Sequence, residues 1–151
     1  VMSKLVGASR PKFQLSKEYP RDWIQARFDS NERILGVTST PTHWILWSAK
    51  FTKRLQQGCY LRNGWTSTRD HIREKWTSNF YLTAVSHKSG SNLIAMTKGV
   101  QTGAQRYTRC SSVANFEKQC TTDWNEGRRI LFVGHDDERW WLATSKGLSW
   151  I

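Results

Sequence analysis

Hydrophobic and polar positions recur along the chain at a fixed step. The segments 27–39, 75–87 and 123–135 align without a gap. Apolar positions in them recur every 48 residues: Phe28, Trp76 and Trp124; Ile34, Leu82 and Ile130; Val37, Val85 and Val133. Self-similarity at one period predicts a repeat architecture, in which each unit covers the hydrophobic face of its neighbour.

Each unit divides into one helical and several extended stretches. Apolar residues ahead of the shared aromatic position have helical spacing, as at Ile24 and Phe28, which predicts short helices of roughly 8 to 10 residues. Two β-rich runs follow each helix and are joined by the polar connectors STPT, HKSGS and HDDE, a pattern typical of a β-hairpin. A further strand precedes each helix, and an aromatic residue recurs in it at a step of 47: Phe13, Tyr60 and Tyr107.

These elements predict a mainly β fold with short helices, built from about three 48-residue strand-helix-strand-strand repeats. A period in the forties is typical of propeller blades, and closed propellers usually need at least four of them, so we expect a propeller-like or open repeat array. We interpret residues 1–151 as one repeat domain with units at about 1–46, 47–94 and 95–142, and with 143–151 beginning a further unit. Because the chain opens with Val1, three interpretations stay open: a fragment of a longer chain, a processed form, or the ordered part of something longer.

The aromatic and sulfur-containing residues refine this interpretation. Nine tryptophans occupy mostly repeated apolar positions, so we expect most of them in the core rather than on stacking platforms. Cys59, Cys110 and Cys120 cannot all pair and form no C-x-x-C motif, which indicates free thiols in a reducing, intracellular compartment. The chain shows neither a secretory signal nor an apolar run long enough for a membrane span, and the sequence leaves an organellar (mitochondrial) and a nuclear location open.

Charge gives the main functional indication. Lys and Arg number 23 against 12 Asp and Glu, for a net charge of +11, and such an excess predicts a polyanionic partner. Lysines recur at the ends of equivalent runs, so a repeating fold would place them on one rim, joined by further basic residues nearby. The predicted basic rim consists of Lys4, Lys50, Lys53, Arg54, Lys98, Arg106, Arg109 and Lys146. The alternative is that a lysine merely ends each strand and protects sheet edges from aggregation.

The sequence lacks the motifs of the common enzyme classes. A protein kinase needs a Gly-rich loop, a strand lysine, an H-R-D-like loop and a D-F-G, and none of these occurs. A G-x-S-x-G elbow is also missing. We interpret His43, His87 and His135 as solvent-exposed connector residues rather than metal ligands, and the acidic run 136–138 as a solvated hairpin tip. We therefore expect no catalysis, cofactor, metal or small-molecule substrate.

Five segments carry a resemblance to a known family: VMSK (1–4), YPRDWIQARF (19–28), DHIREKWTSNFYLTAVS (70–86), LIAMTKG (93–99) and DWNEGRRILFVG (123–134). They resemble the repeat region that follows the kinase domain in plant and algal casein-kinase-I-like protein kinases. The resemblance implies a propeller-like accessory domain of uncharacterised role that serves in docking. One unit departs from the pattern, because WSAK replaces the S-K-G ending.

These observations predict a non-catalytic scaffold that docks on structured RNA in a large ribonucleoprotein, such as an organellar ribosome. No RNP-like segment, GXXG clamp or zinc-finger spacing is visible, so recognition would rest on shape and backbone. The competing hypothesis is a protein-interaction or kinase-associated regulatory domain that binds acidic protein segments. Neighbouring proteins of a large complex are partners under either hypothesis.

Overall fold

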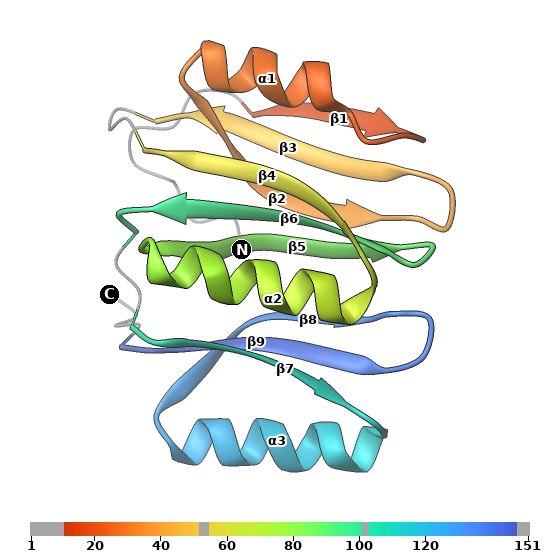
Figure 1. Ribbon diagram of the computed structural model, residues 1–151, viewed down its shortest axis with the longest axis vertical. Coiled ribbons are helices and arrows are strands. Elements are labelled where there is room, and N and C mark those ends of the chain that lie inside the picture. The colour runs from red at the N-terminus through yellow and green to blue at the C-terminus, as the bar shows by residue number, and fades with distance from the viewer. Residues whose placement is uncertain (1–10, 52–54, 101–102, 148–151) are drawn as a thin grey trace.

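A computed structural model describes residues 11–51, 55–100 and 103–147, and their fold is mainly β. Nine strands form three antiparallel three-stranded sheets, with one helix belonging to each sheet (Figure 1). The elements in chain order are β1 (Lys12–Ser16), α1 (Arg21–Asp29), β2 (Glu32–Ser39), β3 (Trp44–Lys50), β4 (Gln57–Asn63), α2 (Gly64–Thr77), β5 (Phe80–Lys88), β6 (Ser91–Lys98), β7 (Gln105–Cys110), α3 (Val113–Asn125), β8 (Arg128–His135) and β9 (Trp140–Lys146).

All three sheets have the same strand order. The strand that precedes the helix lies at one edge, the strand that follows it lies at the other edge, and the last strand lies between them. We call β2, β5 and β8 the inner strands, because β2 contacts β5 and β5 contacts β8, so that the sheets succeed one another along the molecule (Figure 1). The sheets span residues 12–50, 57–98 and 105–146, and their boundaries fall a few residues beyond those drawn from the sequence.

The helices are longer than the spacing predicted, except for the first. They contain 9, 14 and 13 residues, because α2 begins directly at the end of β4 and α3 begins just after β7. The third helix is capped by Ser112, whose side chain accepts a hydrogen bond from the Asn115 N–H. None of α1, α2 and α3 is long and apolar enough to span a membrane.

Each inner strand contains one β-bulge at the same place. The register shifts between Ile34 and Gly36, between Leu82 and Ala84, and between Ile130 and Phe132. A bulge leaves one residue unpaired and increases the local twist. At equivalent positions of all three sheets, the bulge therefore interrupts the alternation of side chains between the two faces of the sheet.

Large and small side chains alternate across the inner and middle strands. Gly36 lies opposite Trp47, and a Cβ atom added at Gly36 would fall 1.8 Å from the indole ring. At the equivalent position of the third sheet the sizes are exchanged, with Phe132 opposite Ala143. Interiors packed to near-crystal density require such compensation.

Two hydrophobic clusters hold the sheets together. The first contains Ile24 of α1 with residues of the first and second sheets, and the second contains Ile72 of α2 with residues of the second and third sheets. Of the eight tryptophans in the described ranges, Trp44 and Trp141 are buried, Trp124 is exposed, and five are half-buried. Three of the half-buried rings, Trp23, Trp65 and Trp76, pack against the two clusters. Five of these eight tryptophans therefore belong to the core or contact it, in agreement with the expectation.

The pairing of β1, β4 and β7, which we call the outer strands, corrects the alignment of aromatic residues drawn from the sequence. Phe13, Cys59 and Tyr107 lie opposite Trp47, Ala95 and Ala143, which are themselves 48 residues apart. Cys59, rather than Tyr60, is thus the equivalent of Tyr107. Tyr60 points to the other side of its sheet, where its ring centroid lies 4.4 Å from that of His71 on α2.

A glutamine side chain links each pair of successive sheets at the bulge. Gln57 of β4 accepts a hydrogen bond from the Ile34 N–H at 2.7 Å and donates to the Ile34 carbonyl at 3.0 Å. Gln105 of β7 repeats both bonds with Leu82, at 2.8 and 3.0 Å. We call this arrangement the glutamine clamp. It pairs backbone groups of an edge strand that face away from the strand's own sheet.

Replacing Gln105 with Leu should lower the free energy of unfolding by about 2 to 4 kcal/mol. The change leaves three partners without their bond: the N–H and C=O of Leu82, and the Trp76 indole N–H, which also donates to Gln105 at 3.1 Å. Urea denaturation measures the effect. The matched control is Gln14→Leu, since the Gln14 amide donates to the neighbouring Leu15 carbonyl near solvent. Equal losses in the two variants would contradict the role of the clamp.

Candidate functional site

Three lysines of the predicted basic rim lie at one end of the molecule. Lys50, Lys98 and Lys146 are the last residues of the middle strands β3, β6 and β9, and all three are exposed. The middle strands end on the same side of the molecule (Figure 1). We call these three residues the lysine edge.

The residues opposite the three lysines in the described registers are a carboxylate, an aromatic ring and a cation. Glu32 lies opposite Lys50 in the register, but its carboxylate is 2.6 Å from the ammonium of Lys12 and 3.4 Å from the guanidinium of Arg27. Burial would raise the pKa of Glu32, but hydrogen bonds from Lys12 and Ser48 outweigh burial and hold the pKa below its usual value. Lys98 lies opposite Phe80, with its ammonium 5.8 Å from the ring centroid. Lys146 lies opposite another cation, Arg128.

The remaining members of the predicted rim are placed differently. Lys4, Lys53 and Arg54 lie outside the described residues. Arg106 is paired with the buried Asp123 and, at 2.9 Å, with Glu126. Arg109 lies at the far end of β7 from the lysine edge, opposite Trp141 near the β8–β9 turn. The charges of both arginines are thus compensated within the protein, and Arg109 does not share a rim with the lysines.

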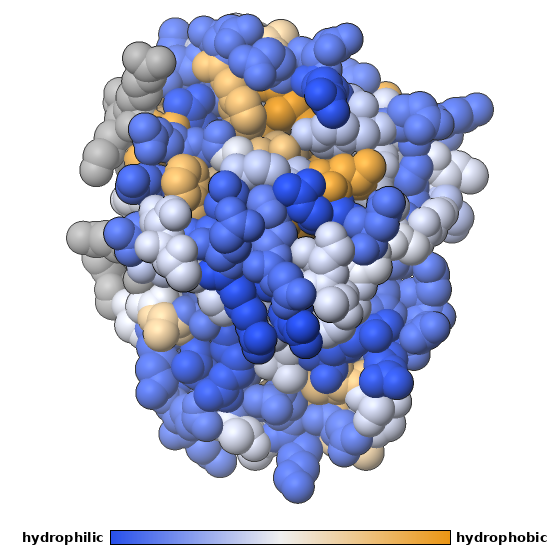
Figure 2. Space-filling model, viewed as in Figure 1, coloured by the Kyte–Doolittle hydropathy of each residue, from blue (hydrophilic) through white to orange (hydrophobic). Residues whose placement is uncertain are grey.

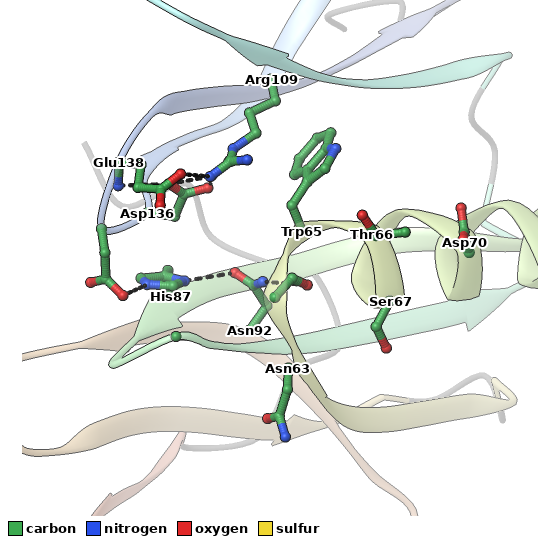
Figure 3. Close-up of a pocket in the computed structure, with 13 residues that line it drawn as sticks. Asn63, Trp65, Thr66, Ser67, Asp70, His87, Asn92, Arg109, Asp136 and Glu138 are labelled. Atoms are coloured by element: carbon green, nitrogen blue, oxygen red, sulfur yellow. Dashed lines mark hydrogen bonds and ion pairs between the residues drawn. The ribbon is translucent and has the colours of Figure 1, made fainter.

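Arg109 instead forms part of a polar pocket at the hairpin end of the molecule (Figure 3). The first turn of α2, the β5–β6 hairpin and the β8–β9 turn line this pocket. Nε and Nη2 of Arg109 lie 2.8 and 3.0 Å from the carboxylate oxygens of Asp136. The guanidinium also lies 5.7 Å from the ring centroid of Trp65, which stacks on Tyr107 at 4.7 Å.

Asp136 is the most constrained acid of this pocket. It is 7% exposed and also accepts hydrogen bonds from the N–H groups of Glu138 and Arg139. Burial would raise the pKa of Asp136, but Arg109 and the two amides outweigh burial and lower it. The bond to Asp136 correspondingly raises the pKa of Arg109. The interpretation of 136–138 as a solvated tip was therefore wrong for Asp136.

His87 also departs from the interpretation as an exposed connector residue. Its side chain is 9% exposed, Nδ1 lies 3.1 Å from the Asn92 amide oxygen, and Nε2 lies 3.2 Å from the Asp137 carboxylate. Asn92 in turn donates to the hydroxyl of Thr68 on α2 at 2.9 Å. This chain of bonds joins the β5–β6 hairpin to α2 and to the β8–β9 turn, and it serves to position elements.

Burial makes at least one of the three cysteine thiols unreactive. Cys59, Cys110 and Cys120 are free thiols, as expected, and burial raises the pKa of Cys59 to about 12, which makes it a poor nucleophile. Across 11–51, 55–100 and 103–147, no group of three or more His, Cys, Asp or Glu side chains could hold a metal ion.

The outward face of α2 carries charges of both signs. Figure 2 shows a mainly hydrophilic surface, with the most hydrophilic side chains crossing its middle, where α2 lies in Figure 1. This helix carries Arg69, Arg73 and Lys75 together with Asp70 and Glu74. The mixture distinguishes this face from the lysine edge, where the equivalent residue of each sheet is a cation.

Comparison with known proteins gives one match. Residues 34–151 match the model of a family described as "Domain of unknown function (DUF7477)". No curated protein and no solved structure matches the chain.

Replacing Asp136 with Asn should destabilise the protein by about 1 to 3 kcal/mol at pH 7, because Arg109 loses its buried counter-charge. A lowered folded-state pKa gives stability that is present above the ordinary value of about 3.9 and lost as pH falls through the folded pKa. The difference between wild type and variant should therefore shrink below about pH 4. Urea denaturation across this pH range measures it, with the exposed Asp29→Asn as control. A difference that persists unchanged in acid would contradict the account.

Proposed function

The chain belongs to the family DUF7477, whose function is unknown, and we propose that it is a non-catalytic scaffold that binds structured RNA through the lysine edge. The observation that carries the proposal is the placement of Lys50, Lys98 and Lys146, one exposed ammonium at the same end of each sheet. The bound RNA is recognised by its phosphate backbone, with little reading of bases.

The charge distribution supports this choice of partner. The chain carries a net charge of +11, while buried or half-buried carboxylates such as Glu32, Asp123 and Asp136 are paired with cations inside the fold. Neutralised phosphates release condensed counterions, which favours binding to a polyanion at low salt. Lysines repeated from sheet to sheet present charge along a line, as an extended phosphate backbone requires.

The succession of sheets supports a propeller-like, open array as the architecture of this scaffold. The three sheets share one strand order and one bulge position, are joined by two glutamine clamps, and contact one another through their inner strands. Such an array offers an extended binding surface, in keeping with a module of a large ribonucleoprotein. Binding of an acidic protein segment by the same lysines is the competing outcome of the test below.

Changing Lys50, Lys98 and Lys146 together to Glu should weaken binding to a structured RNA by about tenfold or more, and should lower the slope of log K against log salt by about 2 to 3. Fluorescence anisotropy across a salt series measures both quantities. The control changes Lys17, Arg21 and Lys118 to Glu, three exposed cations away from the lysine edge, so that both variants have the same net charge.

Equal loss of affinity in the two triple variants would show that only net charge matters and would overturn the proposal. A length-matched acidic peptide provides the second arm. Tighter binding of the peptide than of the RNA, with dependence on the lysine edge, would reassign the partner to protein.

A further inference from the structure

The third sheet exposes a face whose counterparts in the first and second sheets are buried. Ile34 and Leu82 are 1% and 2% exposed, whereas the equivalent Ile130 is 43% exposed. Val37 and Val85 are each 7% exposed, whereas Val133 is 46% exposed. Trp124 of α3 is 61% exposed, although its equivalents Phe28 and Trp76 pack against the two clusters.

The molecule itself shows twice what covers this face. Cys59 and Leu61 of β4 pack on the first cluster, beside the clamp of Gln57 on Ile34. Tyr107 of β7 belongs to the second cluster, beside the clamp of Gln105 on Leu82. In both cases the cover comes from the next sheet: its middle strand contributes Leu93 and Ala95 or Trp141 and Ala143. Its outer strand adds a glutamine and, two residues later, a side chain that packs on the apolar cluster.

The receiving half of a third clamp is present on β8. Its bulge between Ile130 and Phe132 repeats those at Ile34 and Leu82, so the Ile130 N–H and C=O face the edge of β8 that β9 does not occupy. Within the part of the chain that the structure describes, no glutamine reaches Ile130, and the neighbouring apolar side chains stay exposed. The N–H and C=O of Ile130 thus lie at the centre of an uncovered hydrophobic face.

We propose that this face of the third sheet docks a further sheet of the same type, whose outer strand presents a glutamine to Ile130 and a bulky apolar or aromatic residue two positions later. The partner buries Ile130, Val133 and Trp124 and completes the backbone pairing at the bulge. The apolar contact supplies the driving force, and the clamp fixes the register. This inference is independent of the proposed binding of RNA, because it involves another face of the molecule.

The chain's own first sheet provides only half of this chemistry. On β1, Phe13 and Leu15 are 67% and 61% exposed and supply the apolar part. Lys12 pairs with Ser48, which places Pro11 where Gln57 and Gln105 stand on β4 and β7. Proline cannot form the clamp, so a second copy of the unaltered chain is a poor occupant.

The same position offers a test with the full chain. The donor carries Pro11→Gln together with Val133→Glu. Its new glutamine can form the clamp, but its own third sheet carries a charge and cannot accept a partner. The acceptor is the unaltered chain, which has the receiving face but no clamp. Both substituted positions are exposed, and circular dichroism checks that each variant is folded. We expect donor and acceptor each to be monomeric alone and to form a 1:1 complex when mixed, measured by sedimentation velocity.

Two comparisons decide the outcome. A donor with Pro11→Leu and Val133→Glu keeps the apolar contact but cannot form the clamp, and it should bind the acceptor about tenfold more weakly. An acceptor with Val133→Glu should not bind the Pro11→Gln donor. The proposal would be overturned if the folded donor and acceptor formed no mixed complex. It would also be overturned if the two donors bound the acceptor equally well, or if the two acceptors bound the Pro11→Gln donor equally well.

Discussion

The arrangement of the whole molecule depends on how an edge strand with a bulge finds partners for its backbone. At Ile34 and Leu82 the N–H and C=O groups face away from their own sheet, and an unpaired backbone group in a buried interface costs about as much as a lost hydrogen bond. Gln57 and Gln105 satisfy both groups at once with one amide. Because an amide both donates and accepts, glutamine fits this role, whereas leucine or a lysine would not.

The clamp also fixes how each sheet packs on the sheet before it. It holds the outer strand of one sheet against the inner strand of the preceding sheet, so that Tyr107 and Trp141 can fill the space over Leu82 and Val85. The same placement brings the middle strands to a common end, where Lys50, Lys98 and Lys146 emerge. Structural linkage and a repeated surface charge therefore follow from one spacing along the chain.

Much of the fold could be predicted from the sequence, because apolar residues at a fixed period report the core directly. The series through Ile34, Leu82 and Ile130 gave the repeating order of elements, and the polar connectors gave the hairpins. The series could not show that Ile130 is exposed, since burial depends on the next sheet and not on the residue itself. Gln57 and Gln105 are also 48 residues apart, but a polar residue in a strand resembles a solvent-facing one. Their shared spacing was the one signal available.

The candidate site was less accessible to sequence reasoning for geometric reasons. Arg109 is near Arg106 in the chain, but the direction of β7 carries it away from the lysine edge towards Asp136. His87 lies near the end of β5, next to a turn, which suggests exposure, yet its imidazole contacts Asn92 and Asp137. Long-range partners of this kind are set by how sheets succeed one another, which a local pattern does not encode.

Amide hydrogen exchange, followed by NMR, tests the account most directly at three backbone positions. The N–H groups of Ile34 and Leu82, which donate to Gln57 and Gln105, should exchange slowly, and that of the equivalent Ile130 should exchange at a rate close to that of an open edge strand. Slow exchange at Ile130 to the same degree, or fast exchange at Leu82, would contradict the claim that the glutamine clamp joins successive sheets.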